Sequence, residues 1–533
     1  MDVLIIGSGP AAAGAALALL DSPGVTVRVL DVGGRLEADN EAARLRMADG
    51  APASWSAQDR GMISKVAAPS STHKLPEKRV FGSSFPFDDF GQLDGVSAQG
   101  DENTHVISGA YGGFSNTWGA QTMPYSAASF DDWPVTREEL ALDYRAVLDV
   151  LPFSGEDDDL EEYFPLYVDA DPLPALSENS SRILDSYRRH RLQVRRHGVI
   201  MGKARLALRG TSCVSCGLCM TGCPYSYVYS ASQTFDALIA QGRVDYVDGQ
   251  LALALGEDDE GPFVTARNVG DGDVSTFRAD KILVACGSIG TTRLVASSLG
   301  RWSQPIHLQE SVQFLMPLAA LRANKKLSQD GSFTLNQFNM VLPFDESGRD
   351  LVQIHGYPYN EAMNDAVPAI LRAPALRGLR DMLLKRLTVG LGYLPSWWSS
   401  GFDVTIERPD EANQPARVVL SHSNSAHDES KKRLRAINAR LMRAAPFLGV
   451  VPVVPMVTMS APGKSYHFGG SFPHSRDPVL GHQSDLLGRV HPWRHVHLVD
   501  ASVFPTVSAT TFTLTIMANA HRIARLVAQG DDA

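Results

Sequence analysis

The chain opens with Asp2–Gly14, whose sequence is DVLIIGSGPAAAG. The apolar residues up to Ile6 are typical of a buried parallel strand, and a glycine-rich turn and an alanine-rich helical stretch follow them. The turn has the pattern G-x-G-x-x-A. In this pattern Gly7 permits a tight turn, Gly9 lets the backbone approach a pyrophosphate, and the small Ala12 allows close helix–strand packing. The stretch therefore predicts a dinucleotide-binding β–α unit.

A second strand follows this helix and supports the prediction. Val25–Leu30 is typical of another buried strand, and Asp31 comes directly after it, where a carboxylate can accept hydrogen bonds from ribose hydroxyls. The motif alone would also suit a glycine turn in an unrelated α/β unit. The order strand, turn, helix, strand and acid favours the dinucleotide site, although the glycines do not distinguish NAD from FAD.

Four cysteines stand close together in the middle of the chain, with the spacing C-x2-C-x2-C-x3-C-P: Cys213, Cys216, Cys219 and Cys223. Bacterial ferredoxins hold [4Fe–4S] clusters with this ligand pattern. Gly217 and Gly222 lie inside the run, where the backbone must bend sharply. The run therefore predicts a [4Fe–4S] cluster and the movement of single electrons.

The cluster prediction leaves alternatives open. Because the chain has one such run, either Cys223 closes the cluster or one iron takes another ligand, and the fifth cysteine, Cys286, is far away in the sequence. The four thiols could instead hold zinc or form disulfides. Zinc sites usually join two C-x2-C units across a longer gap, so zinc matches the spacing less well.

Length and charge limit the class of protein. A chain of 533 residues exceeds the size of one hydrophobic core and indicates about two or three domains. The formal net charge of −10 gives no support to nucleic-acid binding. We find no apolar run long enough to cross a bilayer and nothing before Gly7 that resembles a targeting signal. A cluster and free thiols suit a reducing compartment, so we expect a cytoplasmic protein.

The carboxyl-terminal region contains another strand–turn–helix segment. Val496–Thr506 reads VHLVDASVFPT, and a final helix begins near Thr515. Asp500 offers a hydrogen-bond acceptor and the helix N-terminus offers backbone donors, which together could meet a ribityl chain and a flavin pyrimidine edge. Taken alone, the segment is equally consistent with an ordinary strand–turn–helix.

With these motifs in one chain, the sequence resembles the glucose–methanol–choline (GMC) oxidoreductases, which bind FAD. Two further stretches match that family. Gly112–Gly119 is similar to its flavin-contacting glycine–serine loop, in the version of pyranose oxidases, and Lys281–Gly290 with Arg293 is similar to the late strand and turn of its FAD domain. The resemblance assigns these residues to FAD: Gly7, Gly9, Ala12, Asp31, Gly112, Gly113, Ser115, Asn116, Gly287 and Asp500. Thr117 stands where some members carry a histidine that attaches the flavin, which implies non-covalent FAD.

The resemblance also implies the reacting residues. GMC enzymes oxidise alcohols by hydride transfer to the flavin while a histidine takes the hydroxyl proton, and Tyr466–Ser471 matches that histidine's segment, which makes His467 the candidate base. An unperturbed imidazole has a pKa of about 6.5 and can accept a proton at neutral pH. Thr511 replaces the usual His or Asn partner; it can bond a substrate oxygen or cap the final helix but is a poor base. His474 and His491 are alternative bases.

The predicted fold class is α/β (α+β overall), with a discontinuous Rossmann-like FAD-binding domain, a substrate domain containing a mostly antiparallel sheet, and a small ferredoxin-like cluster insertion. The predicted FAD domain comprises residues 1–35, 75–120, 200–300 and 465–533. The substrate domain comprises 121–199 and 301–464, and the cluster insertion comprises 205–230.

Two basic features suggest partners. Arg205 and Arg209 flank the cysteine run and could offset the charge of a cluster or contact an acidic electron carrier, or could simply be solvated. Residues 370–398 interleave five basic residues with leucines and with Trp397 and Trp398. This stretch is consistent with a peripheral membrane or lipid contact, or with a packing helix and lid of the substrate domain.

Together these features favour an FAD-dependent dehydrogenase that acts on an alcohol, such as a secondary hydroxyl of a sugar or polyol. Flavin accepts two electrons as a hydride and can release them singly through a [4Fe–4S] cluster to a soluble carrier such as a ferredoxin. Electrons could also run in the opposite direction, from a ferredoxin to a carbonyl or alkene substrate, in a reductase or isomerase. A third hypothesis is a redox sensor or assembly subunit without turnover.

Overall fold

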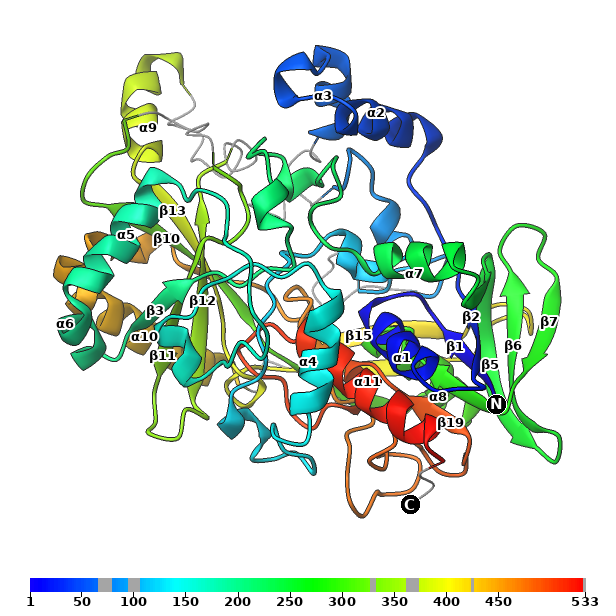
Figure 1. Cartoon of the computed structure of the whole chain (residues 1–533). Helices are drawn as coiled ribbons and strands as arrows, with labels where there is room; N and C mark the ends of the chain where they lie inside the picture. The colour runs from blue at the N-terminus through cyan, green and yellow to red at the C-terminus, as the bar shows by residue number, and fades with distance from the viewer. Residues whose placement is uncertain (66–78, 94–105, 326–331, 361–372, 423–425, 531–533) are drawn as a thin grey trace.

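The computed structural model describes residues 1–65, 79–93, 106–325, 332–360, 373–422 and 426–530. Its fold is α/β, with helices and four sheets. A five-stranded sheet lies near the amino terminus, and a seven-stranded sheet lies on the other side of the molecule (Figure 1). Helices α4 (Ala141–Val150) and α11 (Thr513–Ala528) contact each other between the two sheets.

The five-stranded sheet is parallel throughout and has the order β19-β8-β1-β2-β4. Its strands come from three distant parts of the chain: β1 (Asp2–Ile6), β2 (Thr26–Leu30), β4 (Val244–Val247), β8 (Lys281–Val284) and β19 (Val496–Leu498). In β1 and β8 the residues from Val3 to Ile6 and from Ile282 to Val284 are buried, as expected for strands covered on both faces.

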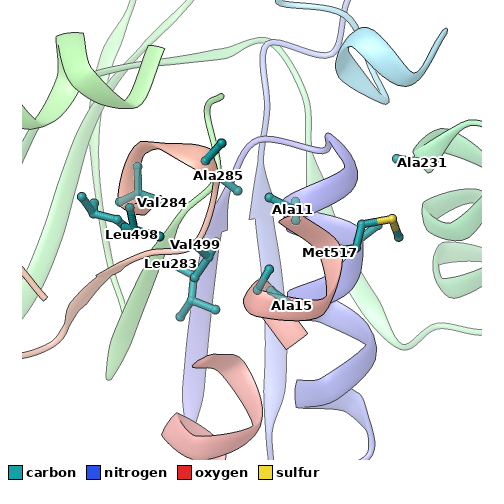
Figure 2. Close-up of a cluster of buried hydrophobic side chains, with 14 of the residues drawn as sticks. Ala11, Ala15, Ala231, Leu283, Val284, Ala285, Leu498, Val499 and Met517 are labelled. Atoms are coloured by element: carbon teal, nitrogen blue, oxygen red, sulfur yellow. The ribbon is translucent and has the colours of Figure 1, made fainter. Parts of the chain in front are cut away.

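Helices cover this sheet at close range. In α1 (Pro10–Leu20), a Cβ atom added at Gly14 would lie 2.4 Å from the carbonyl oxygen of Met517 in α11, so the two helices meet backbone to backbone. Figure 2 shows Ala11 and Ala15 of α1 beside Met517. The small residues of the alanine-rich stretch thus make room for the carboxyl-terminal helix. Helix α7 (Ala231–Ala240) also contacts the sheet, at β4, and α8 (Ser288–Ser298) follows β8 in the chain.

Two smaller antiparallel sheets extend this half. One contains β5 (Gln250–Asp258), β6 (Gly261–Asn268) and β7 (Val274–Arg278). The other has the order β15-β14-β9-β18 and contains β15 (Arg417–His422), β14 (Phe402–Glu407), β9 (Pro305–Glu310) and β18 (Phe468–Gly469). Because Phe468 pairs with Glu310, the segment that contains His467 is attached to the end of β9.

The seven-stranded sheet has the order β16-β10-β13-β12-β11-β3, with β17 beside β10, and is antiparallel at every pairing. Its strands are β3 (Ile200–Lys203), β10 (Gln313–Ala320), β11 (Phe338–Pro343), β12 (Leu351–Pro358), β13 (Leu387–Tyr393), β16 (Val450–Pro452) and β17 (Thr458–Met459). Helices α5 (Glu178–Arg189), α6 (Arg191–Arg196) and α10 (His427–Leu448) cover one face (Figure 1).

The two faces of this sheet differ in chemistry. Alternate residues such as Phe314, Met340 and Ile354 join the apolar core formed with α5 and α10. The intervening residues point the other way, because successive side chains of a strand alternate between faces. We call the second side, which carries Asn339, Gln353, His355 and Tyr393, the polar face. All four of these side chains are buried, so the polar face is turned toward the protein interior.

A helical hairpin covers the cysteine run. It consists of α2 (Ala38–Ala48) and α3 (Ala57–Ile63), and its buried Ala43, Met47 and Ile63 form a small core with Leu218 and the partly buried Cys216. The cysteine run is thus enclosed by a part of the chain to which the sequence motifs had assigned no role.

Three sequence predictions differ from the structure. Residues 200–203, predicted in the FAD domain, form β3 and pair with β11 in the seven-stranded sheet. Arg205 does not face an electron carrier: it is 1 % exposed and donates to the carbonyl of Phe164, because its guanidinium lies inside the fold, while Arg209 is exposed.

The described part of the basic stretch 370–398 does not form one continuous surface, because it is divided between an exposed helix and an interior strand. Residues 387–393 form the interior strand β13, and Trp398 is 3 % exposed, because it packs in the core beneath the sheet. Exposed leucines and a methionine remain on α9 (Arg377–Leu384), and residues 370–372 lie outside the described ranges. Among the residues described, no helix has the length and hydropathy needed to cross a membrane.

Candidate functional site

The glycine turn after β1 has the conformation that the motif requires. Gly7 has φ +102°, and an added Cβ atom would lie 2.6 Å from the carbonyl oxygen of Ala285, so only glycine fits there. Gly9 is the N-cap of α1, and no described atom lies within 4 Å of a Cβ atom added to it. The first glycine therefore makes the turn, and the second leaves open space at a helix N-terminus.

Asp31 lies at the carboxyl end of β2, close to this turn. It is 7 % exposed and accepts hydrogen bonds from the hydroxyls of Ser8 and Tyr246, the latter over 2.9 Å. Burial raises its pKa to about 6, against the opposing effect of these hydrogen bonds. The Ser8 hydroxyl also accepts the backbone N–H of Gly112 over 2.9 Å. Ser8 therefore ties the fingerprint turn both to Asp31 and to the glycine–serine loop.

The glycine–serine loop reaches the fingerprint turn directly. Gly112 and Gly113 have φ +87° and +57°, and a Cβ atom added at Gly113 would lie 3.3 Å from the Cα atom of Gly9. The hydroxyl of Ser115 donates to the carbonyl of Gly112 over 2.5 Å, and the Asn116 amide donates to that of Gly113 over 2.8 Å. These residues of the predicted cofactor site therefore share one region.

Gly287 and Asp500 occupy the neighbouring strand ends. Gly287 is the N-cap of α8, has φ +76°, and has open space where a Cβ atom would stand. Asp500, 3 % exposed, accepts hydrogen bonds from the Thr291 hydroxyl and from the backbone N–H of Ser502, the second over 2.9 Å. Its pKa is raised, because burial outweighs these bonds.

This donor set fits FAD. The two uncapped helix N-termini at Gly9 and Gly287 can receive negatively charged phosphates. The guanidinium of Arg293 is 2 % exposed, and its Nε and Nη1 atoms have no hydrogen-bond partner within the described residues. Its Nη2 atom donates to the carbonyl of Ala252, and a buried charge that is only partly paired is costly, so this cation is consistent with a nearby anionic group. Asp31 and Asp500 provide acceptors for hydroxyl groups.

His467 lies where the two halves of the molecule meet. Its ring stacks on Tyr393 of the polar face, with 4.3 Å between ring centroids and 17° between planes, and contacts Phe512 at 4.8 Å. Burial lowers its pKa to about 3, so the imidazole is neutral at physiological pH. Its Nδ1 atom is buried and has no hydrogen-bond partner in the part of the chain described.

The backbone on both sides of the His467 ring is fixed by β9. The N–H of Ser311 donates to the carbonyl of His467 over 2.8 Å, and the N–H of His467 donates to the hydroxyl of Ser465 over 3.1 Å. That hydroxyl donates in turn to Glu310 over 2.7 Å. Glu310 is fully buried, which raises its pKa to about 7. The orientation of the imidazole thus depends on a buried carboxyl group.

The other predicted reacting residues are placed differently. The Thr511 hydroxyl donates to the carbonyl of Gln121 over 3.3 Å, and it caps no helix, because α11 begins at Thr513 with Phe512 as its N-cap. His474 binds the carbonyl of Asp485 and the amide of Asn519 with its two ring nitrogens, so it is structural. His491 is exposed.

The sequence motifs missed a second imidazole. His355 on β12 is 1 % exposed, and its ring lies 5.5 Å from that of Tyr393, on the polar face. Its pKa is lowered to about 3 by burial and by repulsion from His467. Its Nε2 atom lacks a hydrogen-bond partner among the described residues. The alternation of polar and apolar residues in Gln353–Tyr357 could have indicated a strand with a polar interior face.

Comparison with known proteins found no matching family model and no matching curated protein. The structure is similar to pyridoxine 4-oxidase from Mesorbium loti, with a TM-score of 0.59, 14% identity and 98% of each chain covered. It is also similar to a mutant of formate oxidase from Aspergillus oryzae RIB40, determined to study FAD modification, with a TM-score of 0.60, 13% identity, and 100% of this chain and 99% of that chain covered. The chain has the fold of these two oxidases. At these identities, the fold is what they share with it.

The cysteine run is the remaining predicted site. All four thiols are free and partly buried, and electrostatic interactions link Cys223 with each of the other three. The backbone N–H of Thr334 donates to the Cys219 sulfur over 3.4 Å. Over the described ranges, however, no three His, Cys, Asp or Glu side chains are placed so as to hold a metal ion. The thiols suit an iron–sulfur cluster by their chemistry, and the cluster stays a prediction.

Proposed function

We propose that this chain is an FAD-dependent oxidoreductase of the GMC type that oxidises an alcohol, with His467 as the base. The observation that carries this proposal is the stacking of His467 on Tyr393 at the junction of the dinucleotide unit and the polar face. A substrate held at that junction would meet a neutral imidazole. FAD, held non-covalently by the residues described above, would supply the acceptor for the hydride.

The surroundings of His467 keep its ring unprotonated. A pKa of about 3 leaves the ring nitrogen free to accept a hydroxyl proton at pH 7, and it also makes the ring a weaker base than an imidazole whose pKa lies near the working pH. Ser311 and Ser465 fix the backbone of His467 and Tyr393 stacks on its ring before a substrate arrives, which lowers the entropic cost of reaching a reactive geometry. Because His355 is also neutral, it places no positive charge against the protonated form of His467.

We further propose a dehydrogenase rather than an oxidase, acting on a secondary hydroxyl of a sugar or polyol. The thiolates of Cys213, Cys216, Cys219 and Cys223 would hold a [4Fe–4S] cluster, which supplies one-electron transfer. A soluble carrier such as a ferredoxin would receive the electrons. The gathering of four free thiols under the α2–α3 hairpin supports this assignment.

Hydrogen bonds and short chain segments connect the cysteine run with Thr511, whose neighbour Phe512 contacts the His467 ring. Thr334 donates to Cys219, and two residues later the amide of Asn336 donates to that of Gln121 over 2.7 Å. The carbonyl of Gln121 in turn accepts the hydroxyl of Thr511. A continuous path of contacts is consistent with communication between the two sites.

Anaerobic flavin reduction tests the proposal. Alcohols, sugars and polyols are added to the flavin-loaded protein, bleaching is followed by absorbance, and frozen samples are examined by EPR. We expect bleaching in the wild type and in the matched control His491→Ala, and a loss of about 100-fold or more in His467→Ala. Equal rates in both variants would disprove the role of His467. Reduction by a low-potential donor but by no alcohol would favour the ferredoxin-fed direction.

A further inference from the structure

Four amide side chains meet at the polar face. They come from three segments of the chain and are at most 3 % exposed: Gln121, Asn336, Asn339 and Gln353. We call them the amide cluster. Asn336 donates to the amide oxygens of Gln121 and Asn339 over 2.7 and 2.8 Å. Such polar groups have to be fully paired to be stable in the interior of a protein.

The pairing of the amide cluster is incomplete. The amide nitrogens of Gln121, Gln353 and Asn339 all point to the thioether sulfur of Met123, at 2.8, 2.9 and 3.5 Å. A thioether is a weak acceptor and cannot satisfy three donors. Two amide oxygens, Oδ1 of Asn336 and Oε1 of Gln353, have no hydrogen-bond partner in the ranges that the structure describes. The cluster thus lacks both donors and acceptors.

Tyr393 stands between the cluster and the proposed base. Gln353 is the direct cross-strand neighbour of Tyr393, on which His467 stacks, and His355 follows Gln353 on the same face of β12. A molecule that places one hydroxyl at His467 would extend toward these amides. The unpaired Nε2 of His355 adds a further polar atom to the same face.

The missing partners define the chemistry of a ligand. Unpaired oxygens require donors, and amide N–H groups that meet only sulfur require a better acceptor; a hydroxyl group supplies both. The cluster itself carries no formal charge. Asp158, which lies beside Asn339 over Gly202, accepts the backbone N–H groups of Leu160 and Lys203, and its charge is already balanced by the buried Arg205. A charged ligand group would therefore be buried here without a counter-charge, which is unfavourable.

We infer that the amide cluster binds the hydroxyl groups next to the one that is oxidised, and that the substrate is a neutral compound with several adjacent hydroxyls. This inference rests on the proposed function for its direction, since it takes His467 as the reacting end. It goes beyond that function by assigning the recognition of the substrate to Gln121, Asn336, Asn339 and Gln353.

The test compares substrates and variants in the flavin-loaded protein. A cyclitol or pyranose is compared with cyclohexanol, which has one hydroxyl on a similar ring, and with a sugar acid, which adds a carboxylate. We expect kcat/KM for flavin reduction to be at least 100-fold higher for the polyol than for either analogue. Similar values for the polyol and cyclohexanol would overturn the inference while leaving the proposed function intact.

The variant Gln353→Met removes the amide at nearly constant shape. We expect it to raise KM for the polyol 10-fold or more and to leave Tm unchanged or higher. Gln250→Met, outside the cluster, is the matched control. A lower Tm with unchanged polyol kinetics would show that the amide is structural and would overturn the inference.

A binding measurement separates the two proposals. Titration of the oxidised protein with polyol is followed by calorimetry, without turnover. Saturable binding that Gln353→Met weakens 10-fold or more would support the inference even if no alcohol bleached the flavin and the proposed function failed. Equal binding to the wild type and to Gln353→Met would overturn it.

Discussion

The pH dependence of flavin reduction provides the strongest test of His467. If this residue is the base, only its neutral form reacts, and its pKa of about 3 keeps it neutral across the range in which most proteins are stable. An imidazole with an ordinary pKa of about 6.5 would be ~91% neutral at pH 7.5 and ~3% neutral at pH 5, a loss of about 30-fold. With the lowered pKa, the loss over the same interval is about 1 %.

The measurement is rapid-mixing absorbance of anaerobic, flavin-loaded protein with saturating substrate, transferred to pH values between 5 and 8 just before mixing. We expect the protonation of His467 to change the rate of flavin reduction very little between pH 5 and pH 8. Glu310 is the main complication, because its pKa of about 7 lies inside this range and it holds the Ser465 hydroxyl. The variant Glu310→Gln keeps a polar side chain without the titration and serves as the control.

Two results would refute this reasoning. A 30-fold decrease centred near pH 6.5 that persists in Glu310→Gln would mean that the base is an ordinary, solvated imidazole rather than the partly buried His467 with its lowered pKa. A pH-independent rate that is equally fast in His467→Ala would mean that another group accepts the proton. A decrease centred near pH 7 that disappears in Glu310→Gln would instead assign the effect to the carboxyl group that orients the loop.

The remaining predictions concern stability and cofactor content. Burial raises the pKa of Glu310 from 4.5 to about 7, so the folded state holds its proton to higher pH than the unfolded state does. The free energy of unfolding of the wild type, relative to Glu310→Gln, should therefore fall by about 3 kcal/mol as pH rises from about 4.5 to about 7. Chemical denaturation at each pH measures this, and parallel plots of unfolding free energy against pH for the two proteins would contradict it. Gly14→Ala would place a Cβ atom 2.4 Å from the Met517 carbonyl and should destabilise the apoprotein by about 1–3 kcal/mol, as measured by thermal unfolding. Gly9→Ala has open space and an allowed φ of −71°, so it should keep the apoprotein Tm and weaken FAD binding; a lowered Tm would show that this glycine is structural. Cys219→Ser should lose iron and acid-labile sulfide, whereas Cys286→Ser should keep both, and equal iron contents in the two variants would exclude the proposed ligands.

The local motifs were readable from the sequence because they depend on neighbouring residues. The strand ending at Ile6 and the tight turn at Gly7 were predicted from thirteen consecutive residues and lie where the motif requires them. The strand of residues 25–30 was predicted to within one residue, as Thr26–Leu30. Glycine conformations and strand patterns of this kind are dictated by backbone sterics over short distances.

The partners of His467 were not readable in the same way. Its segment could be identified, but its contact with Tyr393 depends on the pairing of β18 with β9 and on the register between β12 and β13. His355 is 112 residues away from His467 in sequence, and no short motif connects them. The location of Arg205 in the interior rather than at the surface likewise depends on which segments cover it.

By itself, the sequence determined the dinucleotide turn, the order of the motifs, the candidate base and the four grouped thiols, because these follow from backbone sterics and from the spacing of ligand atoms along the chain. Only the tertiary structure decided that His467 is a neutral imidazole near a second one, and that four unevenly paired amides lie at the polar face that carries Tyr393. The physical reason is that a pKa and a binding surface depend on burial and on contacts between segments far apart in sequence.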